Sequence, residues 1–172
     1  PFIMCTQLFP MSKYQAFPGC TIDDFKVLIQ NKNNSLLFRI RFEFIEEKDP
    51  TKGQPYLSRA KCRNVYNAEY DNGRISSAEY LETTLTDIDF RIVHDIYNWR
   101  GMDILTMQVA RAGFLPEQLR STVIKYYKLK TELKSASGPE TEEEKNEREY
   151  IYSRSKAKLN SLYGMCATNP IR

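Results

Sequence analysis

Apolar and charged residues alternate along residues 37–47, which read LFRIRFEFIEE. The apolar positions on one side of an extended chain are Phe38, Ile40, Phe42 and Phe44. The charged positions between them are Arg39, Arg41 and Glu43. This alternation predicts a strand of an antiparallel sheet, with one face in a core and the other facing water.

The segments before this strand carry weaker signals. The apolar start of the chain, residues 1–9, predicts a short helix. Prolines and a glycine interrupt residues 9–19, which favours a loop. A second short helix is expected at residues 22–30.

The segments after the strand predict a hairpin, a helix and two further strands. Asp-Asn-Gly at residues 71–73 lies between two short strand candidates, which is the pattern of a tight hairpin turn. Residues 79–86 and 103–114 suit strands. Between them, Thr86 with Asp89 three residues on predicts the capped start of a helix.

From about residue 114 the pattern becomes helical. Pro116 suits the first turn of a helix. The apolar positions that follow at helical spacing are Leu119, Val123, Tyr126 and Leu133. The segment SASGPE, residues 135–140, breaks this helix.

A second long helix is expected after the break. Thr141 with Glu144 repeats the capping pattern, and the glutamates beside them suit a helix N-terminus. This helix should run to about Tyr163, with Gly164 as its C-terminal cap. The two helices together predict a long antiparallel helical hairpin.

The composition is that of a globular chain, and the patterns along the chain predict the fold class α+β. Its 172 residues, 41% of them hydrophobic, suffice for one domain or two small lobes. The patterns divide it into a mixed strand-helix part, about 1–113, and the hairpin, about 114–164. The net charge of +3 arises after residue 115, where 11 cations face 8 acids, whereas the first 115 residues carry 14 of each. No acid follows Tyr150.

Several classes of function are disfavoured. The cysteines (Cys5, Cys20, Cys62 and Cys166) form no C-x-x-C pair, so they suit reduced thiols of a cytosolic protein. The single histidine, His94, suits a structural role on a helix, which argues against a histidine-based catalytic or metal site. There is no apolar run long enough to span a membrane and no leader peptide. A chain that begins at Pro1 either has lost its start or is a piece of a longer protein.

Lys156, Asn160 and Tyr163 are spaced by four and three residues, so they share one face of the last helix. A cation, an amide and an aromatic ring in this arrangement suit a nucleotide, since they can meet phosphate, sugar and base. The alternative is a solvated helix face with one packed tyrosine. Spacing by itself leaves both interpretations open.

The residue string adds a resemblance. Residues 156–164, K-x-x-x-N-S-L-Y-G, resemble the fingers motif of family B DNA polymerases, most closely the bacteriophage, protein-primed type. A segment like ATNP follows that motif in those enzymes, as here at 167–170. Residues 126–131, YYKLKT, are similar to the first fingers helix, and residues 71–97 to the segment between palm and fingers. PFIM at the start is similar to the end of the first palm motif.

The resemblance implies roles for the residues of the motif. Lys156 would contact the triphosphate of the incoming deoxynucleotide, and Asn160 would help to hold it. Tyr163 and Gly164 would lie beside the nascent base pair. The physics agrees, because a transferring phosphoryl group needs neutralised charge and fixed alignment.

A second phosphate-binding cation is expected on the first helix of the hairpin, and two arguments disagree on its identity. The resemblance at YYKLKT indicates Lys130. A turn centred near Gly138 would instead place Arg120 opposite Lys156. We take Lys130 as the candidate and Arg120 as its rival.

The resemblance further implies two Mg²⁺ ions, held by palm carboxylates whose motifs would lie before Pro1 and after Arg172. We therefore expect no catalytic residue and no metal ligand within this chain, and no synthesis by the chain alone. The carboxylates Asp87 and Asp89 could substitute, but a helix cap and first turn explain them better. The same holds for Asp23 and Asp24.

The predicted domain organisation follows the same family. It comprises a palm remnant (1–19), a palm-to-fingers segment (20–113), the fingers (114–164) and a return towards the palm (165–172). The partners would be primer–template DNA, a dNTP and, for residues 20–112, a priming protein, with the polymerase acting in the cytoplasm of a bacterial cell. Two other classes remain open: a non-catalytic nucleic-acid-binding module and a module that binds a priming protein.

Overall fold

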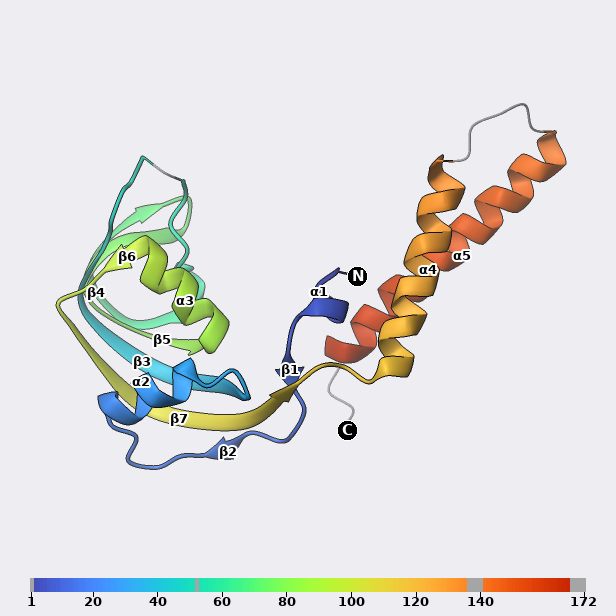
Figure 1. The fold of residues 1–172 in the computed structure, drawn as a ribbon. Coiled ribbons are helices and arrows are strands. Elements are labelled where there is room, and N and C mark those ends of the chain that lie inside the picture. The colour runs from blue at the N-terminus through green and yellow to red at the C-terminus, as the bar shows by residue number, and fades with distance from the viewer. Residues whose placement is uncertain (1, 52, 136–140, 168–172) are drawn as a thin grey trace. The chain divides into compact units, whose positions relative to one another are not determined.

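The computed structural model describes residues 2–51, 53–135 and 141–167. Residues 165–167 are described by their backbone alone. The chain forms two compact units (Figure 1). One comprises residues 10–113, and the other joins residues 1–9 to residues 114–172. None of the helices in the described ranges combines the length and the apolar character that a membrane crossing requires.

The sheet unit contains most of the strands and two short helices. The helices are α2 (Ile22–Gln30) and α3 (Asp87–Ile96), and a single 3₁₀ turn covers Arg59–Lys61. The long strands are β3 (Asn34–Glu47), β4 (Cys62–Asp71), β5 (Arg74–Thr86) and β7 (Gly101–Gly113). The two-residue strands are β1 (Phe9–Pro10), β2 (Gln15–Ala16) and β6 (Tyr97–Asn98).

β3 is the central strand of an antiparallel sheet whose order is β1-β7-β3-β5-β4. β2 also pairs with β7, and β6 pairs with β3. The predicted hairpin is confirmed: Asn72 and Gly73 have φ of 46° and 75°, which suits a two-residue turn between β4 and β5. β5 is one strand rather than the two expected, because it pairs with β3 and β4 along both halves of its length.

The core lies on the face of the sheet that α2 and α3 cover, and α3 lies inside the curve of the sheet (Figure 1). Phe25 of α2, Phe38 of β3 and Phe90 of α3 meet there. Their ring centroids are 4.9 to 5.9 Å apart in edge-on geometry. Edge-on pairs of this kind stabilise a core beyond the burial of their area. The amphipathic pattern of β3 therefore fixes which face both helices cover.

The prediction for Phe44 is wrong. Phe38, Ile40 and Phe42 are buried as expected, but Phe44 is 49% exposed and Ile45 is buried in its place. Phe44 has a φ of 49°, in the left-handed region, so the alternation of faces is interrupted there. Its ring lies under the guanidinium of Arg100, 4.9 Å from the centroid, which gives the exposed ring a partner.

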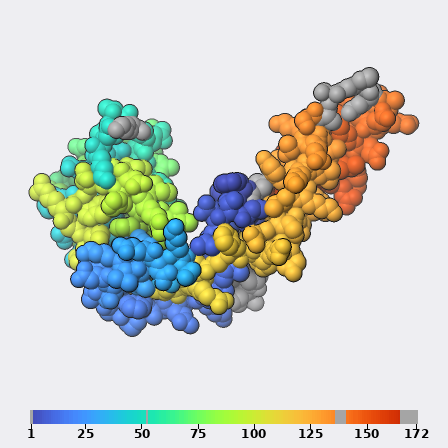
Figure 2. Space-filling view, in the orientation of Figure 1, coloured from blue at the N-terminus to red at the C-terminus, as the bar shows by residue number. Residues whose placement is uncertain are grey.

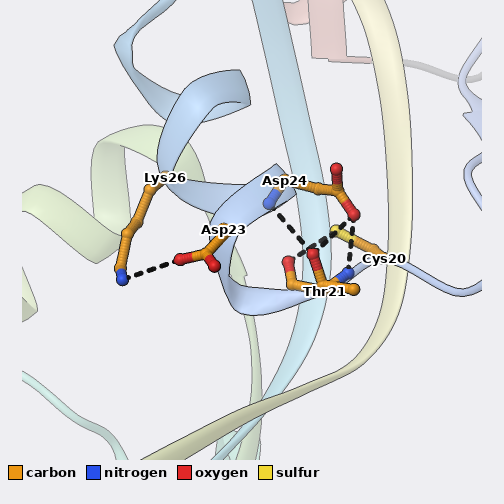
Figure 3. Close-up of polar contacts among 5 residues, drawn as sticks. All are labelled: Cys20, Thr21, Asp23, Asp24 and Lys26. Atoms are coloured by element: carbon orange, nitrogen blue, oxygen red, sulfur yellow. Dashed lines mark hydrogen bonds and ion pairs between the residues drawn. The ribbon is translucent and has the colours of Figure 1, made fainter.

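The capping box predicted at Thr86 and Asp89 is confirmed, and α2 begins with a second box where only a helix start was expected. At the start of α2, the Asp24 amide donates to Thr21 Oγ1 (3.1 Å), and the Thr21 amide donates to Asp24 Oδ2 (3.0 Å; Figure 3). In the next turn, Lys26 pairs with Asp23 at 3.0 Å. Thr86 and Asp89 repeat the reciprocal pair at the start of α3. Each box satisfies two amides that have no partner within the helix.

The hairpin unit consists of α1 (Phe2–Thr6), α4 (Glu117–Ser135) and α5 (Glu142–Ala167). Side chains of α4 and α5 are in contact (Figure 2). The buried cluster that joins the three helices is small: Met4, Val123 and Leu159. The residues between the long helices, 136–140, lie outside the described ranges.

The start of α5 is as predicted, but its end is not. The Glu144 amide donates to Thr141 Oγ1 at 3.3 Å, and the Thr141 amide donates to Glu144 at 2.9 Å. Gly164, however, is not a C-terminal cap, because α5 continues through it to Ala167. Glycine permits the left-handed conformation of a cap but does not impose it, and the helical hydrogen bonds continue across it.

Short strands within residues 9–19 were also not predicted. β1 and β2 each have two residues, which is too short for a periodic signal in the sequence. Both extend the sheet at β7, so tertiary pairing and not local propensity creates them.

Candidate functional site

A cavity of about 270 Å³ opens beside the contact between α4 and α5. Four of the residues that line it are predicted site residues: Lys130, Lys156, Asn160 and Tyr163. Met4 and Leu159 complete the lining. The structure thus brings the three residues of the motif together with the candidate cation from the other helix.

The helical period of α5 explains the shape of the cavity. Lys156, Asn160 and Tyr163 fall on one face because each step of three or four residues is close to a full turn. Leu159 lies about 60° from Lys156 around the helix, towards α4, and is only 9% exposed. Together with Met4, 5% exposed, it forms an apolar floor below polar side chains.

The rim of the cavity is exposed and cationic. Lys156 and Asn160 are exposed, Lys130 is half-buried, and the ring of Tyr163 is 65% exposed. There is no carboxylate among the lining residues. Two ammonium groups, an amide and a hydroxyl around an apolar floor suit an anion that also carries a flat, apolar part.

Two contacts between the helices explain why Lys130 reaches this cavity. Lys158 Nζ donates to Tyr126 Oη at 2.7 Å, and Arg148 donates to the Leu133 carbonyl at 3.2 Å. Because the helices are antiparallel, the two pairs place Lys156 opposite residues 125–128 of α4, within about one and a half turns of Lys130. The sequence argument for Arg120 assumed a turn about three residues nearer the N-terminus.

Arg120 occupies a different part of the hairpin unit. Its guanidinium carbon lies 5.3 Å from the centroid of the Phe114 ring, and its carbonyl accepts a weak contact from Cys5 Sγ at 3.9 Å. It does not line the cavity. The only candidate from α4 that shares the cavity with Lys156 is therefore Lys130.

Two residues of the cavity were missed by the sequence analysis. Leu159 could have been found, because it is the one large apolar residue between Lys156 and Asn160, which indicates contact with the other helix. Met4 could not, because it comes from the far end of the chain and joins the floor only through tertiary packing.

The aspartates considered as metal ligands have structural partners. Asp89 accepts hydrogen bonds from the Thr86 amide and from the hydroxyl of Tyr56. Burial raises the pKa of Asp89, but these hydrogen bonds outweigh it and leave the pKa below its ordinary value. Asp87 accepts from the Leu36 amide at 3.2 Å. The interpretation of this pair as a cap and first turn is confirmed.

The described part of the chain contains no candidate metal-binding cluster. Within residues 2–51, 53–135 and 141–167, no group of three or more His, Cys, Asp or Glu side chains could hold a metal ion. The described residues therefore do not fit the Mg²⁺ ions that the family resemblance implies, and we derive no step through them. Cys5, Cys20 and Cys62 are free thiols, and the side chain of Cys166 lies outside the described residues.

His94 lies at the edge of the aromatic core of the sheet unit. Its ring centroid is 5.9 Å from Trp99 and 6.4 Å from Phe90. The side chain is 63% exposed and its Nδ1 lies 3.8 Å from Asp95. These contacts agree with a structural position for this residue.

Over nearly its whole length, the chain has the fold of a segment of a DNA polymerase. Neither the protein-family models nor the curated proteins give a match to it.

Phi29 DNA polymerase is among the solved structures that this chain resembles. The structure of that enzyme with primer–template DNA, a post-translocation binary complex, is 20% identical, with a TM-score of 0.64. The ternary complex with primer–template DNA and incoming nucleotides is 18% identical, with a TM-score of 0.61. Both comparisons cover 98% of this chain. The chain spans about a quarter of the phi29 polymerase chains, 24% and 25% respectively.

Proposed function

We propose that this chain is a segment of a family B DNA polymerase of the phage type, and that its hairpin is the fingers that bind the incoming dNTP. The observation that supports this most directly is the shared cavity of Lys130, Lys156, Asn160 and Tyr163. The cavity adds one observation to the motif, which is the position of Lys130. The motif is a string of residues on α5, whereas the cavity also needs a lysine from α4.

The chemistry of the cavity suits a nucleoside triphosphate. Lys156 and Lys130 would neutralise the phosphates, and the amide of Asn160 would donate to a phosphate or sugar oxygen. The exposed ring of Tyr163 would face the nascent base pair, and Gly164 beside it would leave space there. Catalysis by such a site is alignment and charge stabilisation, with no covalent step on the protein.

The experiment is a titration of the 172-residue protein with a dNTP at low salt, followed by chemical shifts or calorimetry. Lys156→Ala is expected to weaken binding about 10-fold or more, since a hydrogen bond to a charged group contributes roughly 1.5–3 kcal/mol. Lys130→Ala should also weaken dNTP binding. Arg120→Ala should have no effect if Lys130 is the second cation.

Lys145→Ala is the matched control, because Lys145 is an exposed lysine on the same helix and does not line the cavity. An equal loss of affinity in Lys145→Ala and Lys156→Ala would refute a specific site. In a full-length polymerase, we expect Lys156→Ala to raise KM for dNTP or slow incorporation while primer–template affinity stays near normal.

In this proposal the two Mg²⁺ ions and their carboxylates belong to other parts of the polymerase, so this chain alone should not extend a primer. Primer extension by the purified 172-residue protein would overturn that part. We further propose primer–template DNA as the partner of the whole enzyme and the cytoplasm of a bacterial cell as its location. Contact of residues 20–112 with a priming protein stays a prediction, and a pull-down with the candidate protein would test it.

A further inference from the structure

A second and larger cavity, of about 410 Å³, lies on the hairpin unit. Tyr126, Arg154, Lys158 and Ser161 are among its lining residues. Arg154 and Lys158 lie roughly 160° to 200° around α5 from Lys156, as the 3.6-residue turn requires. The second cavity is therefore on the opposite face of α5 from the proposed dNTP site, and it shares no lining residue with it.

Cations and aromatic rings alternate along this face. Lys158 donates to the Tyr126 hydroxyl and stands 4.6 Å from the ring centroid, which fixes the position of the ammonium group. One turn earlier, the Arg154 guanidinium lies 5.5 Å from the Tyr150 centroid and donates to its hydroxyl at 3.1 Å. The aromatic partners hold both cations in defined places instead of leaving them free in solvent.

The electrostatic environment of this face is positive. No carboxylate lines the cavity, and α5 has no acid after Glu149. Lys158, Lys125 and Arg154 act together on Tyr126: the hydrogen bond from Lys158 contributes most, and all three charges lower the pKa of its hydroxyl. Three cations around one tyrosine create a site for an anion.

The spacing favours a chain of phosphates over a single one. Tyr150, Arg154 and Lys158 follow one another at four-residue steps, which is about 6 Å per step along the helix. Tyr150 is 60% exposed, so its ring offers an apolar platform next to the two cations. A row of fixed cations beside an exposed aromatic ring is the arrangement by which proteins bind single strands.

We propose that this face, formed by Tyr126, Tyr150, Arg154, Lys158 and Ser161, binds a single-stranded nucleic acid. Arg154 and Lys158 contact successive phosphates, the Ser161 hydroxyl donates to one of them, and an unpaired base stacks on Tyr150. A duplex does not satisfy the platform, because its bases are already stacked on one another. This inference does not require the dNTP site on the other face.

The test is binding of a fluorescent twelve-nucleotide oligo(dT) to the 172-residue protein, measured by anisotropy at several salt concentrations. We expect the Arg154→Gln/Lys158→Gln double variant to bind at least about tenfold more weakly, with a salt slope smaller by roughly 1.4 because two phosphate contacts are lost. Tyr150→Ala should weaken binding about fivefold or more while leaving the salt slope unchanged.

The matched control is Lys134→Gln/Lys145→Gln, which removes the same charge from exposed positions of α4 and α5 outside the cavity. Equal affinity and equal slope in the two double variants would overturn the proposal, and so would equally tight binding of a duplex of the same length. Lys156→Ala separates the two faces: it should leave oligo(dT) affinity within about twofold, whatever it does to dNTP binding.

Discussion

Leu159 connects the stability of the hairpin unit with its proposed site, because it belongs both to the small core and to the floor of the cavity. We predict that Leu159→Ala destabilises the hairpin unit and leaves the sheet unit unchanged. The reason is that, among the described residues, the buried cluster of this unit contains only Met4 and Val123 besides Leu159, so the loss of one member removes a large part of it.

The size of the effect follows from burial. The substitution removes about three methylene equivalents from a side chain that is 9% exposed, which corresponds to about 2.4 kcal/mol of transfer free energy. Leucine-to-alanine changes in cores cost about 2–5 kcal/mol once the new cavity is included. Leu159 already borders a cavity, so fewer packed neighbours are lost and we expect about 2–3 kcal/mol.

The chain offers separate probes for its two units. Trp99, the only tryptophan, packs against Phe42 at 5.0 Å within the sheet unit, so its fluorescence follows that unit. Far-UV circular dichroism at 222 nm follows mainly α4 and α5, which have 19 and 26 residues against 9 and 10 in α2 and α3. Urea unfolding should therefore show the dichroism midpoint moving down in Leu159→Ala while the fluorescence midpoint stays.

Two controls make the result decisive. Ile124→Ala truncates an apolar residue of α4 that is 43% exposed, and it should change neither midpoint by much. Leu85→Ala, in the core of the sheet unit, should move the fluorescence midpoint instead. If Leu159→Ala lowers the dichroism and fluorescence midpoints together, or changes neither, then the small buried cluster is not what stabilises the hairpin unit.

Three further predictions concern single positions. Tyr56 donates a hydrogen bond to Asp89, which raises the pKa of Tyr56 to about 12. The contribution of this hydrogen bond to the free energy of unfolding should therefore be complete below pH 10 and be lost as the pH rises towards 12. Tyr56→Phe should cost about 1 kcal/mol of unfolding free energy at pH 7, and the difference between the two proteins' absorbance titrations should show the missing high-pH tyrosine. Thr141→Ala removes the cap of α5 and should lower the dichroism midpoint by an amount that corresponds to about 1 kcal/mol. Gly164→Ala should stabilise α5 by up to about 1 kcal/mol, because a Cβ there meets no atom within 4 Å, and yet slow primer extension in a full-length polymerase if Gly164 lies beside the base pair.

The parts of the fold that depend on local signals could be predicted from the sequence. Both capping boxes of the sheet unit, the turn at residues 71–73 and the helical hairpin are each specified by residues close together in the chain. Phe44 could not be predicted, because its left-handed backbone breaks the alternation without a glycine to signal it. β1 and β2 exist only through pairing with β7, and no local pattern encodes such contacts.

The candidate site could likewise be predicted only where it depends on local signals. The face shared by Lys156, Asn160 and Tyr163 follows from helical geometry within α5, so the sequence predicts it directly. The partner on α4 depends on how the two helices are aligned. An error of about three residues in the turn shifts the position opposite Lys156 by about six residues, from near Tyr126 to Arg120, and Lys130 lies one helical turn beyond Tyr126. The alignment is set by the pairs Lys158–Tyr126 and Arg148–Leu133, which are polar contacts between helices and leave no periodic trace in either one.

The same pairing ties the two faces of the hairpin together. Lys158 faces the larger cavity, and its bond to Tyr126 helps to set the alignment that brings Lys130 level with Lys156 on the other face. A ligand that drew Lys158 away from Tyr126 would therefore remove one of the contacts that hold Lys130 beside Lys156. The alignment would then rest on the contact between Arg148 and Leu133 and on the small buried cluster of Met4, Val123 and Leu159.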